Sequence, residues 1–351
     1  MNDIKSNHWD LEELIDPNKF QDNLDLSGYE KYFLLEILER MIIIRFVEEK
    51  LAQQREIGVI GGPVHLSAGQ EAVAVGVSFN LSKTDRVFGA HRSHSHLLAM
   101  EPCIHGLFAE VLGKDTGLSK GMGGSMHLIN QDSGFYGSVP IVSGTVSLAV
   151  GASFDSLRNN LKDVGVAYLG DGAVEEGVVH ESLNLASILS TPTIFIVENN
   201  LFSSHMHISL RQPRVSTARF AEANNIEYEV VDGNNVLEVF EVSKRLITQC
   251  KEKPKPKFIE AITFRHYGHV DWRKDVDVGV NRSQKDLDNW LKRDPIERLE
   301  SSMLNTSLVT KSDIKDLHIK IHEKIEASWQ RALEDPYPED SQLLSRVYKN
   351  D

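Results

Sequence analysis

The sequence predicts an α/β fold with an open, mostly parallel sheet that is flanked by helices and followed by a helical C-terminal region. An apolar run at residues 166–169 ends in Gly-Asp-Gly, and an amphipathic segment follows from about 178 to 189. A second apolar run begins at Thr193 and ends in Asn-Asn. This order is typical of a strand, a crossover helix and a parallel strand. Because parallel strands end at the same sheet edge, Asp171 and Asn200 should face one another where open α/β sheets bind ligands.

The Gly-Asp-Gly loop has the residue types that a magnesium-diphosphate site needs. Gly170 and Gly172 permit a tight turn and the close approach of backbone N–H groups to a ligand. The helix that follows favours negative charge at its N-terminus. Asp171 and Asn200 offer oxygens, and Mg²⁺ binds oxygens at about 2.0–2.1 Å while bridging carboxylates to phosphates. Either short motif alone would indicate only a turn, but their placement at the ends of consecutive strands favours the ligand site.

The other elements are predicted from the spacing of apolar residues and from turn residues. The predicted segments are a long helix at about 29–55, a second helix to about Phe79, a strand ending near 87–89, a small-residue helix at 147–157, alternating strand and helix at 220–247 with a sharp turn at 232–235, a strand at 258–264, and helices from Leu287 onward that include 314–333. The lysine-rich segment 251–257 is expected to be a solvated linker.

We divide the chain into an N-terminal arm at residues 1–28, an α/β domain at 29–285 and a helical extension of that domain at 286–351. The 351 residues are 41% hydrophobic and 25% charged, which is enough to bury a full core. The arm is polar with scattered apolar positions, so it should pack either on the body or on a neighbour.

The composition argues against several classes of partner. A net charge of −13 provides no general basic face, so neither nucleic acid nor an anionic membrane is expected as a partner. No apolar run reaches the length of a membrane span. Cys103 and Cys250 show no metal-ligand spacing and are expected to be buried in a reducing compartment. The N-terminus lacks the features of a secretory or transit peptide, so the cytoplasm is the expected location.

At this point the sequence resembles a known family. Gly-Asp-Gly, a helix and Asn-Asn are similar to the thiamine diphosphate motif, and the longer match, over about residues 30–345, is to the alpha subunits of 2-oxo acid dehydrogenases of the pyruvate and acetoin type. The resemblance implies thiamine diphosphate and Mg²⁺ as cofactors. It implies that the metal is bound by Asp171, Asn200 and the backbone carbonyl of Phe202, and that the diphosphate lies beside Gly170, Asp171, Gly172, Ala173 and Asn200.

Two histidine-containing motifs extend the resemblance. The stretch from His65 to Ala72 matches H-x-x-x-G-Q-E-A and implies that His65 lines the active-site channel. His91-Arg92 resembles the acetoin type, whereas the pyruvate type has Tyr-Arg; both residues are implied to contact the diphosphate, and a guanidinium suits phosphate. His91, His94 and His96 lie close enough in sequence to suggest zinc, but no carboxylate or cysteine stands beside them.

Three further segments match the family in part. Residues 120–127 match K-G-x-G-G-S-M-H, where His127 would either line the site or hold the loop. Pro140 and Val142 are implied to present backbone groups to the aminopyrimidine ring, although family members usually have glycine in place of Pro140, which lacks an N–H. Arg265 is implied to contact the phosphate and His269 to lie near the thiazolium ring.

Two departures from the family bear on regulation and charge. Regulated mitochondrial relatives have serine at the position of Val270, so the matching phosphorylation switch is absent. Glu175 and Glu176 replace the Asn-Gln of pyruvate-type chains. Two acids near a diphosphate are unfavourable unless they point away or meet a cation.

The resemblance implies half of a catalyst. The glutamate that promotes proton loss from the cofactor belongs to a beta subunit in the family, which predicts a heterotetramer of two alpha and two beta chains. A 2-oxo acid or an acetoin-like compound is the expected substrate, and a lipoyl acyltransferase is a possible acyl acceptor. Two alternatives stay open: a thiamine-dependent carboligase or decarboxylase subunit that acts without lipoate on an aldehyde or sugar, and a non-catalytic scaffold subunit.

Overall fold

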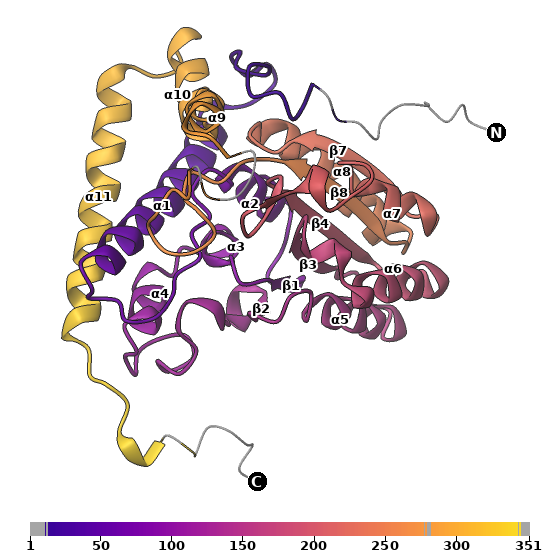
Figure 1. Ribbon diagram of the computed structural model, residues 1–351, viewed down its shortest axis with the longest axis horizontal. Coiled ribbons are helices and arrows are strands. Elements are labelled where there is room, and N and C mark those ends of the chain that lie inside the picture. The colour runs from indigo at the N-terminus through magenta and orange to yellow at the C-terminus, as the bar shows by residue number, and fades with distance from the viewer. Residues whose placement is uncertain (1–10, 12, 277, 279–281, 343, 345–351) are drawn as a thin grey trace.

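The fold is organised around one sheet of six parallel strands in the order β2-β1-β3-β4-β8-β7 (Figure 1). The computed structural model describes residues 11, 13–276, 278, 282–342 and 344. The strands are β1 (Arg86–Gly89), β2 (Phe135–Ser138), β3 (Gly165–Gly170), β4 (Thr193–Asn199), β7 (Glu227–Asp232) and β8 (Lys257–Ile262). A separate antiparallel hairpin pairs β5 (Phe202–Ser203) with β6 (Met206–His207).

Helices cover both faces of the sheet, as Figure 1 shows with α5 and α6 on one side and α1 and α11 on the other. The helices are α1 (Lys31–Glu56), α2 (Glu71–Ser78), α3 (His94–Met100), α4 (Ile104–Val111), α5 (Val146–Arg158), α6 (Gly177–Leu189), α7 (Ala218–Ala223), α8 (Val236–Glu252), α9 (Gln284–Leu291), α10 (Pro295–Asn305) and α11 (Lys311–Glu334). Short 3₁₀ turns are η1 (Gly124–Met126), η2 (Gln131–Ser133), η3 (Ala173–Glu175), η4 (Ile208–Leu210) and η5 (Asp340–Gln342).

The alternation of side chains along β3 explains why both faces need helices. Val166 and Tyr168 join the core under α1, α2 and α8, whereas Ala167 and Leu169 join the core under α5 and α6. A parallel strand that is apolar on both faces must be covered on both faces. The predicted α/β class with a parallel sheet is therefore confirmed.

The predicted linker at 251–257 is confirmed for residues 253–256 and is wrong at its two ends. Helix α8 continues to Glu252, and β8 already begins at Lys257. The ammonium of Lys251 lies 2.6 Å from Asp85, and Lys257, which is 6% exposed, pairs with Glu227. The aliphatic part of a lysine side chain can pack within a helix or strand while its ammonium group pairs with a carboxylate. A lysine-rich segment can therefore contain regular secondary structure, as the two ends of this one do.

The described part of the N-terminal arm packs on the body of the protein. Leu24 and Leu26 are buried in the main core, and the amide of Leu24 donates to Ser302 Oγ at 2.7 Å. The guanidinium of Arg293 donates to the carbonyl of Leu14 at 2.8 Å. Residues 1–10 and 12 of the predicted arm lie outside the described residues.

The C-terminal helices belong to the same core. Trp329 of α11 meets Phe108 of α4 edge-on, with ring centroids 5.1 Å apart, and α11 also packs along α1. Of the two cysteines, Cys250 is buried as expected and Cys103 is partly exposed. Within the described residues, no helix combines the length and apolarity that crossing a bilayer requires.

Candidate active site

A cavity of about 390 Å³ opens at the carboxyl ends of β1, β3 and β4. Cavities of this size at this edge of an open sheet commonly bind small ligands. Many residues named from the sequence line it: His91, Arg92, Val142, Gly170, Asp171, Gly172, Ala173, Asn200, Phe202 and His269. His65, Pro140 and Arg265 are not among the lining residues.

Asp171 and Asn200 reach this cavity because β3 and β4 are adjacent parallel strands that end together. Asn200 is held on both sides: its Nδ2 donates to Gln70 Oε1 at 3.2 Å, and its Oδ1 accepts from the amide of Phe202 at 3.2 Å. Asp171 is 1% exposed. Burial raises the pKa of its carboxyl, and the guanidinium of Arg211 acts in the opposite direction. Asp171 and Asn200 therefore give the cavity wall a carboxylate and a side-chain amide.

The two unexplained acids lie at the mouth of this cavity. Glu175 and Glu176 are exposed residues of the loop between β3 and α6, and both line the cavity. Arg211, just after η4, pairs with Glu175 through Nη1 and with Asp171 through Nη2. One guanidinium therefore neutralises part of the negative charge that the sequence alone could not account for.

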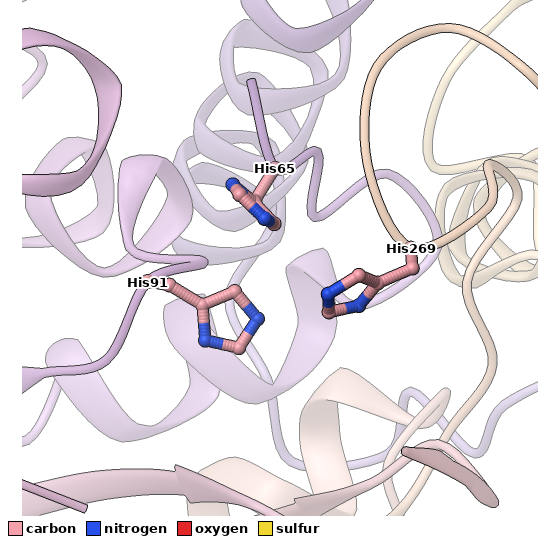
Figure 2. A group of neighbouring side chains, drawn as sticks. All are labelled: His65, His91 and His269. Carbon is pink, nitrogen blue, oxygen red and sulfur yellow. The ribbon is translucent and has the colours of Figure 1, made fainter. Parts of the chain in front are cut away.

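Three imidazoles gather beside the cavity, as Figure 2 shows. His65 precedes α2, His91 follows β1 and His269 follows β8. The ring centroids are 4.8 Å apart for His65 and His91, and 5.6 Å apart for His91 and His269. Burial, followed by the charge of Arg92, lowers the pKa of His65 to about 3, of His91 to about 2 and of His269 to about 4. All three rings are therefore neutral near pH 7.

The charges around this imidazole cluster disfavour a metal ion. One nitrogen from each ring lies within 4.8 Å of the others, so the spacing by itself could hold a metal. The positive charges of Arg92 and Arg265 also act on His65, His91 and His269. That field opposes a cation and favours an anion or a neutral polar substrate.

The low histidine pKa values predict a pH-dependent stability. In the unfolded chain, histidine titrates near pH 6.5, whereas the pKa of folded His269 is about 4. The unfolded state therefore binds more protons between these values, so this stabilisation is complete above pH 6.5 and is lost as the pH falls toward 4. Each such histidine contributes up to about 1.4 kcal/mol per pH unit.

Urea unfolding at pH 7 and at pH 5 measures this effect. His65→Asn and His91→Asn should each reduce the difference in unfolding free energy between the two pH values. His322→Asn is the matched control, because His322 lies on α11 against Phe46 of α1 and outside the cavity lining. An unchanged pH dependence in both test variants would contradict the assignment of neutral imidazoles.

The two arginines named from the sequence have structural partners. Arg92 lines the cavity, and its guanidinium donates to the carbonyls of Leu66 at 2.7 Å and His269 at 2.9 Å. Arg265 is 1% exposed and donates through Nη2 to the carbonyl of Ser204 at 3.2 Å. Its Nε and Nη1 atoms are buried without a partner. Ser204 lines the cavity, so Arg265 lies one layer behind the wall.

The remaining histidines named from the sequence have different partners. His94 lies between Glu48 Oε2 at 2.9 Å and Ser125 Oγ at 2.8 Å. His96 lines the cavity and stacks on Tyr168 with centroids 3.8 Å apart. His127 is exposed, outside the cavity lining, and its ring meets the carbonyl of Gly123 at 3.0 Å, as expected for a residue that holds the loop.

Several site residues were not found from the sequence. Gln70 and Glu198 line the cavity, and both stand inside motifs that the sequence displays, beside Gly69 and Asn199. Arg211 and Arg282 stand in no motif. Arg282 donates to the carbonyls of Arg265 at 3.0 Å and Tyr267 at 2.9 Å, and so supports the loop that carries His269.

The parallel sheet, with a glycine loop, a buried carboxylate and buried guanidinium groups beside the cavity at one edge, defines an α/β protein with a polar ligand cavity. The model of the dehydrogenase E1 component family matches residues 39–341. The alpha subunit of acetoin:2,6-dichlorophenolindophenol oxidoreductase from Bacillus subtilis (strain 168) is 34% identical over 310 residues, which cover 88% of this chain and 92% of that relative.

Alpha subunits of the pyruvate dehydrogenase E1 component are similarly related. The one from Rhizobium meliloti (strain 1021) is 33% identical, with 92% of each chain covered. The one from Porphyra purpurea is 33% identical, covering 93% of this chain and 96% of the relative. The chain therefore belongs to the dehydrogenase E1 component family, and it is an enzyme component of the oxidoreductase class.

Proposed function

We propose that this chain is the alpha subunit of a thiamine diphosphate-dependent 2-oxo acid dehydrogenase, and that it carries the magnesium-diphosphate half of the active site. The observation that supports this most strongly is the convergence of Asp171, Asn200 and Phe202 on one cavity at the carboxyl ends of β3 and β4. Carboxylate, amide and backbone carbonyl oxygens are the ligand set that Mg²⁺ takes.

The residues present fit an anionic cofactor with a hard metal ion. Gln70 Nε2 and two nitrogens of Arg265 are buried donors without a partner, next to a cavity lined by oxygens. Buried donors are rarely left unpaired, so such atoms commonly mark a ligand. The glycines at 170 and 172 leave backbone exposed toward the same space. Thiamine diphosphate, when bound, supplies the carbanion and the electron sink for cleavage next to a carbonyl.

The chain's own residues would bind the cofactor and orient the substrate. Asp171, Asn200 and the Phe202 carbonyl would hold the metal, and the loop at 170–173 with Arg92 would receive the diphosphate. His91 and His269 line the cavity with His65 beside them, and a neutral imidazole can donate a hydrogen bond to a substrate oxygen or accept a proton. Pro140 would offer its carbonyl to the aminopyrimidine, and Val142 lines the cavity.

The chain also presents an apolar surface of the kind that contacts another subunit. Ile141 and Ile188 are each 71% exposed, Leu148 is 54% exposed and Leu185 is 49% exposed. Leu185 and Ile188 lie three residues apart on α6, on the same side of the helix. We therefore propose a beta subunit as partner, two alpha and two beta chains as the assembly, a pyruvate- or acetoin-type substrate, and lipoate on an acyltransferase as acceptor.

Assembly is testable by turnover and by mass. The chain alone should not turn over a 2-oxo acid, and co-production with its beta subunit should restore dye reduction in a heterotetramer measured by light scattering. Ile188→Asp should weaken this assembly, whereas Ile319→Asp, at a 46% exposed site on α11, should not. Robust decarboxylation by the chain purified alone would contradict the proposal.

A further inference from the structure

Arg211 is a cationic partner of the proposed metal ligand Asp171. Its side chain is 8% exposed, and it pairs with Asp171, the proposed metal ligand, and with Glu175. Its Nε donates to the carbonyl of Met206 at 3.2 Å, which ties the guanidinium to the β5–β6 hairpin. A buried carboxylate needs a compensating charge, and Arg211 provides one to Asp171.

The same hairpin also contacts Arg265, the residue expected to bind the phosphate. The carbonyl of Ser204, in the turn of the hairpin, accepts from Nη2 of Arg265 at 3.2 Å. A Cβ built on Gly172 would lie 2.4 Å from Ser203 Oγ, so the hairpin presses against the Gly-Asp-Gly loop. His205 also meets Asp275 Oδ2 at 3.1 Å, and that oxygen accepts from the amide of His269 at 2.9 Å. The hairpin therefore contacts Arg211, which pairs with Asp171, and supplies a carbonyl acceptor to Arg265.

We propose that Arg211 is the resident counter-ion of the metal site, which leaves Asp171 when the metal binds and is then retained by Glu175. This inference rests on the proposed magnesium-diphosphate site. It adds that the competition between Arg211 and the metal for Asp171 sets the metal affinity of that site. It also gives Glu175 a role: the acid accepts the displaced guanidinium, so the loop does not have to release a buried cation without a partner.

Because Arg211 and the metal compete for the carboxylate of Asp171, the proposal predicts the direction in which each substitution changes the metal affinity. Metal binding must break the Arg211–Asp171 pair, so removal of Arg211 should tighten metal binding. Removal of Glu175 should weaken metal binding. Of the two acids that pair with the guanidinium of Arg211, Asp171 would then be the one left, so the metal would compete with a more firmly held cation. Couplings between binding events of this kind usually change affinity by about 5- to 150-fold.

The test measures metal binding rather than turnover. Mn²⁺ prefers the same oxygen ligands as Mg²⁺ and reports its free concentration by electron paramagnetic resonance. We expect Arg211→Gln to bind Mn²⁺ at least about fivefold more tightly than the unmodified chain, and Glu175→Gln to bind it more weakly. In the double variant, Glu175→Gln should have no further effect, because the guanidinium that it receives is gone.

A thermal melt separates this role from simple packing. Without metal, Arg211→Gln should melt lower than the unmodified chain, since Asp171 is left buried and unpaired; with Mn²⁺ the difference should shrink. Arg245→Gln, which removes the exposed Arg245–Glu229 pair, is the matched control and should change neither quantity. An equal loss of melting temperature with and without Mn²⁺, at unchanged affinity, would show that Arg211 only packs the hairpin.

The outcomes also distinguish this inference from the proposed function. If Asp171→Asn leaves Mn²⁺ binding intact, the metal site itself is misplaced. If Asp171→Asn abolishes binding while Arg211→Gln leaves the affinity unchanged, the site stands and the counter-ion role fails. Weaker binding of Mn²⁺ or thiamine diphosphate by Arg211→Gln would show that the guanidinium holds the anion, and would also overturn the inference.

Discussion

Asp171→Asn is expected to abolish the stabilisation that Mg²⁺ and thiamine diphosphate together give the folded chain. The carboxylate is buried at the end of β3 and is the proposed anionic metal ligand, so an amide removes the charge that binds the metal. A ligand at about a hundred times its dissociation constant stabilises the native state by roughly 2.7 kcal/mol. Thermal melts with and without both cofactors should therefore separate for the unmodified chain and coincide for the variant.

The exposed Asp132→Asn substitution is the matched control, because it makes the same chemical change outside the cavity. Its melts should separate as widely as those of the unmodified chain. Equal shifts in Asp171→Asn and in the control would remove Asp171 as a metal ligand.

His269→Ala is expected to lower turnover by about 10²–10⁴-fold, which is the usual contribution of a positioned acid or base. Its ring lines the cavity, and its pKa of about 4 keeps it neutral at pH 7. The backbone of His269 is held independently of the ring: its carbonyl accepts from Arg92 and its amide donates to Asp275. The substitution should therefore leave the loop in place and the affinity for cofactor nearly unchanged.

Cofactor titrations and steady-state rates of the enzyme assembled with its beta subunit check this expectation. His127→Ala is the control, since that ring is exposed and outside the cavity lining. Arg265→Ala should instead weaken cofactor binding. If His269→Ala loses cofactor while the saturated enzyme turns over normally, the proposed role is wrong.

Local patterns predicted the fold and part of the site well. The position of Asp171 and Asn200 on one cavity follows from two facts visible in the sequence, an apolar run before each residue and a crossover helix between them. Neighbouring parallel strands end together, so the two side chains line the same cavity. Gly170 and Gly172 indicated a ligand loop because glycine permits a tight turn and a close approach of the backbone to a ligand.

Long-range contacts could not be predicted in this way. Arg211 meets Asp171 across 40 residues, and Gln70 meets Asn200 across 130. No periodicity connects such positions, because the contacts depend on how a hairpin and a loop pack over the sheet edge. Composition also misled at Lys257, where a lysine in a polar segment begins a buried strand and pairs with Glu227.

The most direct test of the central claim is the location of the metal in a crystal of the chain with its beta subunit, thiamine diphosphate and Mn²⁺ in place of Mg²⁺. Anomalous scattering identifies Mn²⁺ without reference to the protein density. We expect one strong peak within coordination distance of Asp171, Asn200 and the Phe202 carbonyl, with the guanidinium of Arg211 moved away from Asp171. A peak among His65, His91 and His269, or thiamine diphosphate bound with no metal at Asp171, would contradict the account.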